Sequence, residues 1–373
     1  MRFIFLLVVC LLPACLGIAA SAETEPRVEL DPMKVTPMPA PILKIADHPI
    51  LEPRYGAAVV AQDHYLYVIG GSNEAGTRLD TIERIDLESG QTELWGRLKL
   101  ARRHHRAVII GDRIYVLGGT SGMAGGLAGE VSDHPGDDPL IDEEPEKAGV
   151  PPSFFDLKSI DYESTMEVVD LVSRKVTFGP HMPVAKALFG CVVVDGKILV
   201  IGGQKKKGET LFCTNTTEVF DPVSGKWEPG INMPTPRRCV ATVVDGFVVV
   251  VGGYNGHKPL KVVEIFRPHQ KAWHRLPPVA EAINPSASAW LGSFIFFFGD
   301  QGMSSRQLVY DLRAKRLVPY PLPLPDSEFA AALAHQDKLY IVGGGDLRTH
   351  DATAGIQVFV PLPEPAGSLG ASR

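Results

Sequence analysis

The sequence has 373 residues, of which 45% are hydrophobic and 21% charged, a balance that is ordinary for a folded protein. Its formal net charge of −6 excludes nucleic-acid binding through bulk positive charge. The 37 glycines and 31 prolines imply many turns and favour an all-β fold, and the five cysteines are too few for a disulfide framework.

The N-terminal residues have the anatomy of a signal peptide. Arg2 precedes an apolar run that reaches Leu12, and small residues at positions 20–22 end the segment. We therefore expect a signal peptide over residues 1–22, export to the periplasm or the extracellular space, and an N-terminal extension over residues 23–40. Because Leu12-Pro13-Ala14-Cys15 resembles a lipoprotein box, a lipid anchor at Cys15 is the alternative. Later segments fall short of the roughly 18 apolar residues that a span needs, so we expect no transmembrane span in the mature chain.

A repeated unit organises the rest of the chain. An apolar run that ends in glycine recurs six times, and the first glycines are Gly70, Gly118, Gly202, Gly252, Gly299 and Gly343. Neighbouring first glycines lie 44 to 50 residues apart, except for one interval of 84. Each run completes a hairpin, and a third strand and a fourth strand with an aromatic residue follow most of the runs. Units of this length predict the four-stranded blades of a β-propeller.

The ends of the repeat indicate how the ring closes. The last unit has no convincing fourth strand, and the segment from Ile42 to Ala46 precedes the first complete unit. The predicted fold class is therefore an all-β, six-bladed β-propeller over residues 41–362, closed by an N-terminal strand. We expect a disordered tail over residues 363–373.

The paired glycines, the third-strand glutamate and the spaced aromatic residue together resemble the kelch repeat, over roughly Leu51 to Val360. The third-strand glutamates are Glu83, Glu167, Glu218 and Glu264. The fifth and sixth units depart from this pattern, because they carry Leu308 and Gln357 where glutamate is expected. The resemblance implies that ligands bind on the face where the loops after the glycine pairs emerge.

Basic residues gather at the predicted ligand face. Arg54, Arg102 and Lys186 lie 16 residues before the first glycine of their units, and Arg237 lies one residue later in its unit. We call these four residues the pre-strand cations. The complete set of candidate ligand-binding residues is Arg54, Arg102, Arg103, Lys186, Arg237, Arg238, Lys206 and His257. Clustered cations attract anions, so we expect an anionic glycan or an acidic protein segment as the partner. The alternative is that the pre-strand cations pair with the blade glutamates and only hold the blades together.

The interval of 84 residues between Gly118 and Gly202 predicts an acidic insertion in the second blade, over residues 120–164. Its first part, from Thr120 to Val150, carries eight acidic residues and one lysine. One interpretation is a solvated loop, and the other is a lid that screens the basic face until a ligand displaces it.

Enzyme motifs are weak in this sequence. It has neither a nucleophile elbow nor a paired-carboxylate motif, and the copper ligands of galactose oxidase, which also has kelch blades, cannot be placed. We expect no metal and no cofactor, and a monomeric, non-catalytic binding propeller. The alternative is an acidic-sugar mutarotase that resembles N-acetylneuraminate epimerases in architecture, with Arg102 and Arg237 as carboxylate clamps and His105 or Glu328 as weak candidates for proton transfer. A disulfide among Cys191, Cys213 and Cys239 remains open.

Overall fold

The structure is a computed structural model that describes residues 42–122, 161–208, 210–299, 307–320, 328–346, 351–353 and 355–361. Within these ranges it contains strands and no helix, and so no helix that could cross a membrane. The predicted signal peptide, the N-terminal extension, most of the acidic insertion and the tail lie outside the described residues, and these domain assignments stay predictions.

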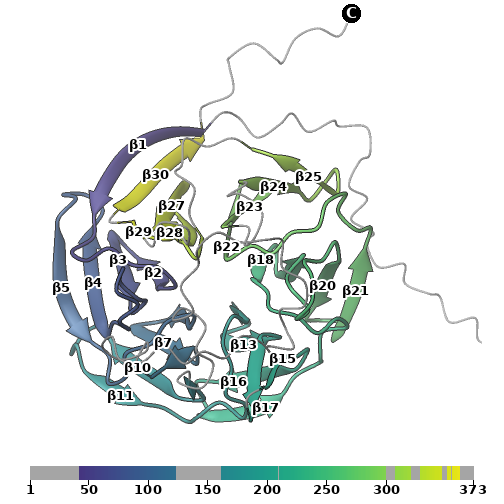
Figure 1. The fold of residues 1–373 in the computed structure, drawn as a ribbon, viewed down its shortest axis with the longest axis horizontal. Coiled ribbons are helices and arrows are strands. Elements are labelled where there is room, and N and C mark those ends of the chain that lie inside the picture. The colour runs from purple at the N-terminus through teal and green to yellow at the C-terminus, as the bar shows by residue number, and fades with distance from the viewer. Residues whose placement is uncertain are drawn as a thin grey trace, which may run out of the picture. The chain divides into compact units, whose positions relative to one another are not determined.

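Six four-stranded antiparallel sheets form the blades, and they follow one another around a centre (Figure 1). Blade 1 contains β2 (Ala58–Gln62), β3 (Tyr65–Ile69), β4 (Thr81–Asp86) and β5 (Thr92–Arg97). Blade 2 contains β6 (Arg106–Ile110), β7 (Arg113–Leu117), β10 (Met166–Asp170) and β11 (Val176–Phe178). Blade 3 contains β12 (Gly190–Val194), β13 (Lys197–Ile201), β16 (Thr217–Asp221) and β17 (Lys226–Pro229).

The second half of the chain repeats the same plan. Blade 4 contains β18 (Thr242–Val244), β19 (Phe247–Val251), β20 (Val263–Arg267) and β21 (Ala272–Leu276). Blade 5 contains β22 (Ala287–Leu291), β23 (Phe294–Phe298), β24 (Leu308–Asp311) and β25 (Arg316–Pro319). Blade 6 contains β26 (Ala331–His335), β27 (Lys338–Val342), β30 (Gly355–Pro361) and β1 (Ile42–Pro49). The six-bladed propeller predicted from the glycine period is confirmed.

The N-terminal strand closes the ring, as predicted. β1 pairs antiparallel with β30, from Ile42 opposite Pro361 to Pro49 opposite Gly355, and so becomes the outermost strand of blade 6 (Figure 1). The first and last described strands therefore share one sheet.

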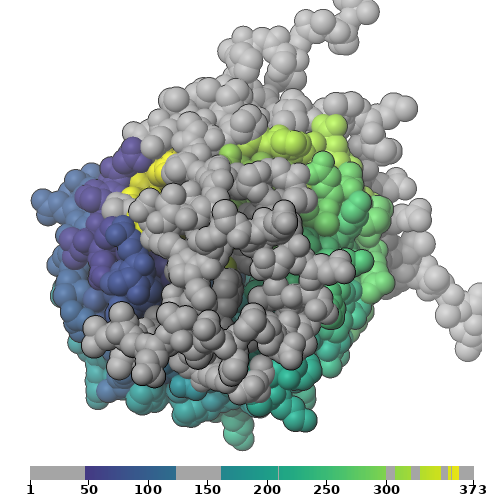
Figure 2. Space-filling view, in the orientation of Figure 1, coloured from purple at the N-terminus to yellow at the C-terminus, as the bar shows by residue number. Residues whose placement is uncertain are grey.

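The apolar runs are continuous because the second strand of each blade is buried on both sides. In β3, Leu66 and Val68 pack in a cluster with residues of blade 6, whereas Tyr67 and Ile69 pack in a cluster with residues of blade 2. Successive side chains of a strand point to opposite faces of the sheet, so each second strand supplies two neighbouring interfaces. Equivalent clusters lie between every pair of consecutive blades, including blades 6 and 1. The outer surface in Figure 2 follows the same blade order, from purple to yellow.

The glycine pair is required by the close approach of the next blade. Gly118 and Gly119 both have positive φ, and a Cβ on Gly118 would lie 2.6 Å from the backbone oxygen of Lys186. The Gly119 N–H donates to that same oxygen at 2.9 Å. Gly71, Gly203 and Gly344 make the equivalent bond to Arg102, Arg237 and Arg54. The repeat signature therefore marks the contact between consecutive blades.

Three blades extend beyond their four strands on the side where the glycine pairs end the second strands. The extra ladders are β8 (Thr120–Ser121) with β9 (Asp161–Tyr162), β14 (Gln204–Lys207) with β15 (Thr210–Cys213), and β28 (Gly345–Asp346) with β29 (Asp351–Ala352). All three lie between the second and third strands of their blades, so they build up the face that the sequence predicted as the ligand face.

Candidate functional site

The four pre-strand cations lie inside the propeller, although the sequence placed them among the ligand-binding candidates. Each is fully buried and pairs with the third-strand glutamate of its own blade. The pairs are Arg54 with Glu83, Arg102 with Glu167 (2.7 Å), Lys186 with Glu218, and Arg237 with Glu264 (2.8 Å). These contacts match the alternative interpretation, in which the cations hold the blades together, and we leave the four residues out of the candidate face.

Arg102 shows how such a pair connects several parts of the fold. Its guanidinium donates to the backbone oxygen of Gly118 at 3.0 Å as well as to Glu167. Glu167 in turn accepts the backbone N–H groups of Lys99 (2.6 Å) and Leu100 (3.2 Å), which lie on the loop from blade 1. Burial lowers the pKa of Arg102, and the charge of Glu167 acts in the opposite direction. The pair fixes the loop between blades, which is a structural role.

Arginines and tyrosines from several blades gather on the face where the glycine pairs end. We define the Arg–Tyr face by the residues Tyr55, Arg78, Arg103, Tyr162, Arg238 and Tyr254. Isolated bridges place Tyr55 next to Ser72, Arg103 next to Thr120, and Arg238 next to Tyr254, at equivalent positions in blades 1, 2 and 4. Tyr55, Arg103 and Arg238 directly follow the pre-strand cations in the sequence. Tyr55, Arg78 and Arg103 are buried, whereas Arg238, Tyr254 and Tyr162 are partly exposed.

Two of the three arginines of this face, Arg103 and Arg238, stack on a tyrosine. Arg103 donates to the Tyr55 hydroxyl at 2.6 Å, and its guanidinium carbon lies 5.5 Å from the centre of that ring. The guanidinium carbon of Arg238 lies 4.4 Å from the centre of the Tyr254 ring. Stacking on a ring holds the plane of a guanidinium. Arg103 is buried, whereas Arg238 is partly exposed, so Arg238 is the stacked arginine that a carboxylate can reach.

The face is strongly positive. The pKa of Arg78 is lowered to about 10, first by burial and then by the nearby charge of Arg103. Burial also lowers the pKa of His104 well below its usual value, and Arg103, Arg78, Arg106 and Arg238 lower it further. His104 is therefore neutral at pH 7, and the guanidinium groups around it supply the positive charge.

The remaining predicted site residues are spread over different environments. Lys206 is partly buried in β14, His257 is exposed in the loop after β19, and Glu328 is partly buried at the start of blade 6. His105 is fully buried, and burial followed by the charges of Arg102 and Arg106 lowers its pKa well below the usual value. Only Arg103 and Arg238 of the predicted set belong to the Arg–Tyr face.

Sequence reasoning missed Arg78 and the three tyrosines of this face. Arg78 and Tyr254 lie in loops just after glycine pairs, Tyr55 directly follows Arg54, and Tyr162 lies at the end of the acidic insertion. The signal that could have found two of them is an aromatic or basic residue that follows the glycine pair of a blade.

The acidic insertion leaves and rejoins the propeller at the Arg–Tyr face. The backbone N–H of Arg103 donates to Thr120 at 3.1 Å, and the hydroxyl of Tyr162 donates to Gln204 at 2.8 Å. Residues 123–160, on which the choice between lid and solvated loop depends, lie outside the described residues.

The three cysteines that the structure describes form no disulfide. Cys191, Cys213 and Cys239 are all free thiols, and Cys239 is buried. In the part of the chain that the structure describes, no group of histidine, cysteine, aspartate and glutamate side chains could hold a metal ion.

Comparison with known proteins agrees with this architecture. The family model of the Kelch motif matches residues 53–91, 185–234 and 236–280, which correspond to blades 1, 3 and 4. Human Kelch domain-containing protein 8B is 28% identical over 156 residues, covering 39% of this chain and 44% of its own length. Beta-scruin of Limulus polyphemus is 23% identical over 246 residues, covering 58% of this chain and 26% of its own length. This chain therefore spans less than half the length of these relatives.

A solved structure shares the fold. The protein described as "Structure of YjhT" superposes with a TM-score of 0.63 at 12% identity and covers 85% of this chain and 97% of its own. At that identity the likeness concerns the fold alone. The Kelch motif matches in three blades, the blade-to-blade role of the glycine pairs and the six-bladed ring together identify this chain as a kelch-repeat β-propeller protein.

Proposed function

We propose that this chain is a non-catalytic binding propeller that holds an acidic protein segment on its Arg–Tyr face. The observation that carries the proposal is the partly exposed guanidinium of Arg238, which stacks on the ring of Tyr254. The buried pair of Arg103 and Tyr55 shows the same stacking at the equivalent position of blade 2 and supports the charge of the face from below the surface. Arginine and tyrosine are the side chains that most often dominate the binding energy of protein interfaces. Guanidinium groups also bind carboxylates through two parallel hydrogen bonds.

An acidic protein segment fits the face better than a rigid small ligand. The residues of the face come from loops of three blades and from the end of the insertion, so the cationic groups are distributed and not gathered in one closed pocket. An extended chain can place several carboxylates along such a surface. An anionic glycan carries similar charges on a sugar chain, and the binding experiment below separates a glycan partner from a protein segment.

The mutarotase alternative has no specific support in the described contacts. Arg102 and Arg237, which would clamp the sugar carboxylate, are buried in ion pairs with blade glutamates. His105, which would transfer the proton, is fully buried.

Export remains part of the proposal. It rests on the signal-peptide pattern of residues 1–22, and N-terminal sequencing of the secreted protein should begin at Glu23. An N-terminus modified at Cys15 would instead support the lipoprotein alternative.

The binding proposal is tested by fluorescence anisotropy of a labelled oligoglutamate peptide, with an oligoglutamine peptide as the uncharged control. We expect Arg238→Gln to weaken binding about tenfold, because it removes a charged, forked donor from the face. Arg97→Gln is the matched control, since this exposed arginine ends the outer strand β5 and pairs with Asp80. Affinity should fall as salt is raised.

Each outcome decides between classes of partner. Binding of a sialylated oligosaccharide but not of the peptide would replace the protein segment with a glycan. An Arg238→Gln affinity equal to that of the parent chain would remove the Arg–Tyr face from the proposal.

A further inference from the structure

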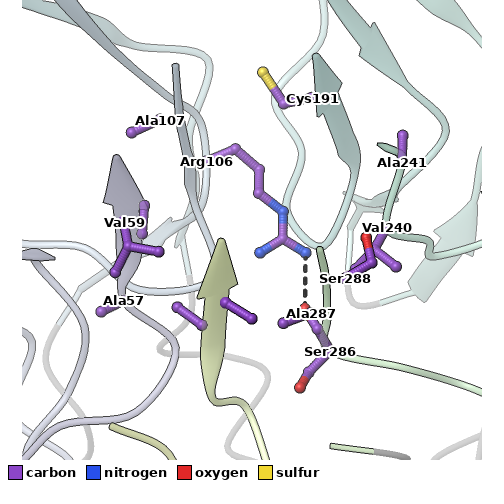
Figure 3. Close-up of a pocket in the computed structure, with 13 residues that line it drawn as sticks. Ala57, Val59, Arg106, Ala107, Cys191, Val240, Ala241, Ser286, Ala287 and Ser288 are labelled. Carbon is purple, nitrogen blue, oxygen red and sulfur yellow. Dashed lines mark hydrogen bonds between the residues drawn. The ribbon is translucent and has the colours of Figure 1, made fainter. Parts of the chain in front are cut away.

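A cavity of about 170 Å³ lies where the innermost strands of the blades meet. All six blades contribute to its wall, mostly through small residues. The lining residues include Ala58, Ala107, Cys191, Ala241, Ala287 and Ala331. Among the residues that line it, Arg106 carries the one full charge, and its guanidinium extends into the cavity between the strands (Figure 3).

Arg106 stands at a position where other blades have almost no side chain. It lies opposite Leu117, the last residue before a glycine pair. The residues in the same register of blades 1, 3, 5 and 6 are Ala58, Gly190, Ala287 and Ala331. A long cation at this position is not needed to build a blade, because four blades do without it.

The contacts of Arg106 leave its charge without a counter-ion among the residues that the structure describes. Its Nε donates to the backbone oxygen of Phe189 at 3.0 Å. Its Nη2 donates to the backbone oxygen of Ser286 at 3.3 Å, which Figure 3 marks with a dashed line. These bonds use two of the five N–H donors of a guanidinium, and both acceptors are neutral carbonyls. The described carboxylates that form ion pairs contact other cations, and none of them contacts Arg106.

The neighbouring thiols do not compensate this charge. Burial raises the pKa of Cys191 to about 12, and burial also raises the pKa of Cys239. Both thiols are therefore neutral at pH 7. A partly buried guanidinium without a counter-ion among the described residues attracts anions, and a bound anion would neutralise its charge.

We infer that the central cavity binds a small carboxylate anion, of the size of acetate, through the guanidinium of Arg106. The remaining N–H groups of the guanidinium can hold both oxygens of a carboxylate side by side. The alanine walls can take its apolar end, and about 170 Å³ has room for such a molecule with water. This site is separate from the protein segment proposed for the Arg–Tyr face.

The test uses the full mature chain and ¹³C-labelled acetate at constant ionic strength. We expect saturable broadening of the carboxylate resonance, and an unfolding midpoint that rises by on the order of 5 °C when acetate exceeds its Kd a hundredfold. Arg106→Gln should abolish both effects. Arg113→Gln is the control, because it removes the same charge from an exposed position of the same hairpin and should leave both effects unchanged.

Two further variants keep the result decisive. If Arg106→Gln does not fold, Arg106→Lys retains the charge without the forked donors and should bind acetate at least tenfold more weakly. Arg238→Gln should bind acetate like the parent chain, whatever it does to peptide binding. Broadening that grows linearly with acetate and does not saturate would overturn the inference. So would broadening that persists in Arg106→Gln, or an acetate affinity of Arg106→Lys equal to that of the parent chain. Binding of inorganic phosphate in place of acetate would overturn it as well.

Discussion

Single residues show that the pre-strand cation and the third-strand glutamate vary together within this chain. Blades 1 to 4 have both charges, and each pair is buried. Blade 5 has neither, because it carries Asn284 before its first strand and Leu308 in the core of its third strand. Losing both partners avoids a buried charge without a counter-ion, whereas losing one partner does not.

This pairing predicts a strong asymmetry between single and double variants of blade 2. Arg102→Asn should reduce the free energy of unfolding by about 3–5 kcal/mol, because Glu167 would remain buried without its cation. Adding Glu167→Leu, which copies blade 5, should recover a large part of that loss. Urea unfolding followed by circular dichroism measures both. The exposed pair of Arg97 and Asp80 is the control, and Arg97→Asn should change stability by less than about 1 kcal/mol. A double variant less stable than Arg102→Asn would contradict the predicted recovery, and would show that the hydrogen bonds of Glu167 to Lys99 and Leu100 outweigh the cost of its unpaired charge.

Among the elements, the turns between the third and fourth strands repeat one device. Asp170 ends β10, and its carboxylate accepts the backbone N–H groups of Ser173 (2.8 Å) and Val172 (3.2 Å) and the Ser173 hydroxyl. Asp86 and Asp221 make equivalent backbone contacts in blades 1 and 3. Hydrogen bonds from the residues that follow lower the pKa of all three carboxyls, and for Asp170 the N–H of Ser173 is the largest cause.

These turns predict a loss of stability in acid. Because the folded pKa of Asp170 is lowered, its contribution is complete above the unfolded value of about 3.9 and is lost as the pH falls through the folded value. Asp170→Asn should therefore flatten the decline of stability as the pH falls below about 4. Unfolding midpoints measured across this range test the prediction, with Asp195→Asn in an exposed hairpin turn as the matched control. A decline as steep in Asp170→Asn as in the parent chain would show that the turn does not contribute.

For the molecule as a whole, the sequence predicted the ring more fully than the face. The glycine pairs repeat because every blade must receive the backbone of its neighbour, as Gly118 receives Lys186, and a requirement repeated in each unit is visible as a period. The Arg–Tyr face has no such period in residue type, since the equivalent positions of blades 1 to 4 carry Tyr55, Arg103, Ala187 and Arg238. The same limit applies to Arg106. The alternation of its strand is visible in the sequence, but only the closed ring shows that the residue faces the central cavity.

The closure of the ring provides a test of the whole fold. β1 pairs with β30 over seven residue pairs and completes blade 6, although its residues are about 300 positions away in the chain. A chain that begins at residue 50 should lose this strand and expose the edge of β30, and we expect its unfolding midpoint to fall by about 10 °C because several backbone hydrogen bonds are lost. A chain that begins at residue 41 keeps β1 and should match the parent, which separates closure from the effect of shortening. A synthetic peptide of residues 42–49 should restore part of the lost stability by adding to the open edge. If the chain without β1 unfolds at the temperature of the chain that retains it, closure by the N-terminal strand does not stabilise the propeller.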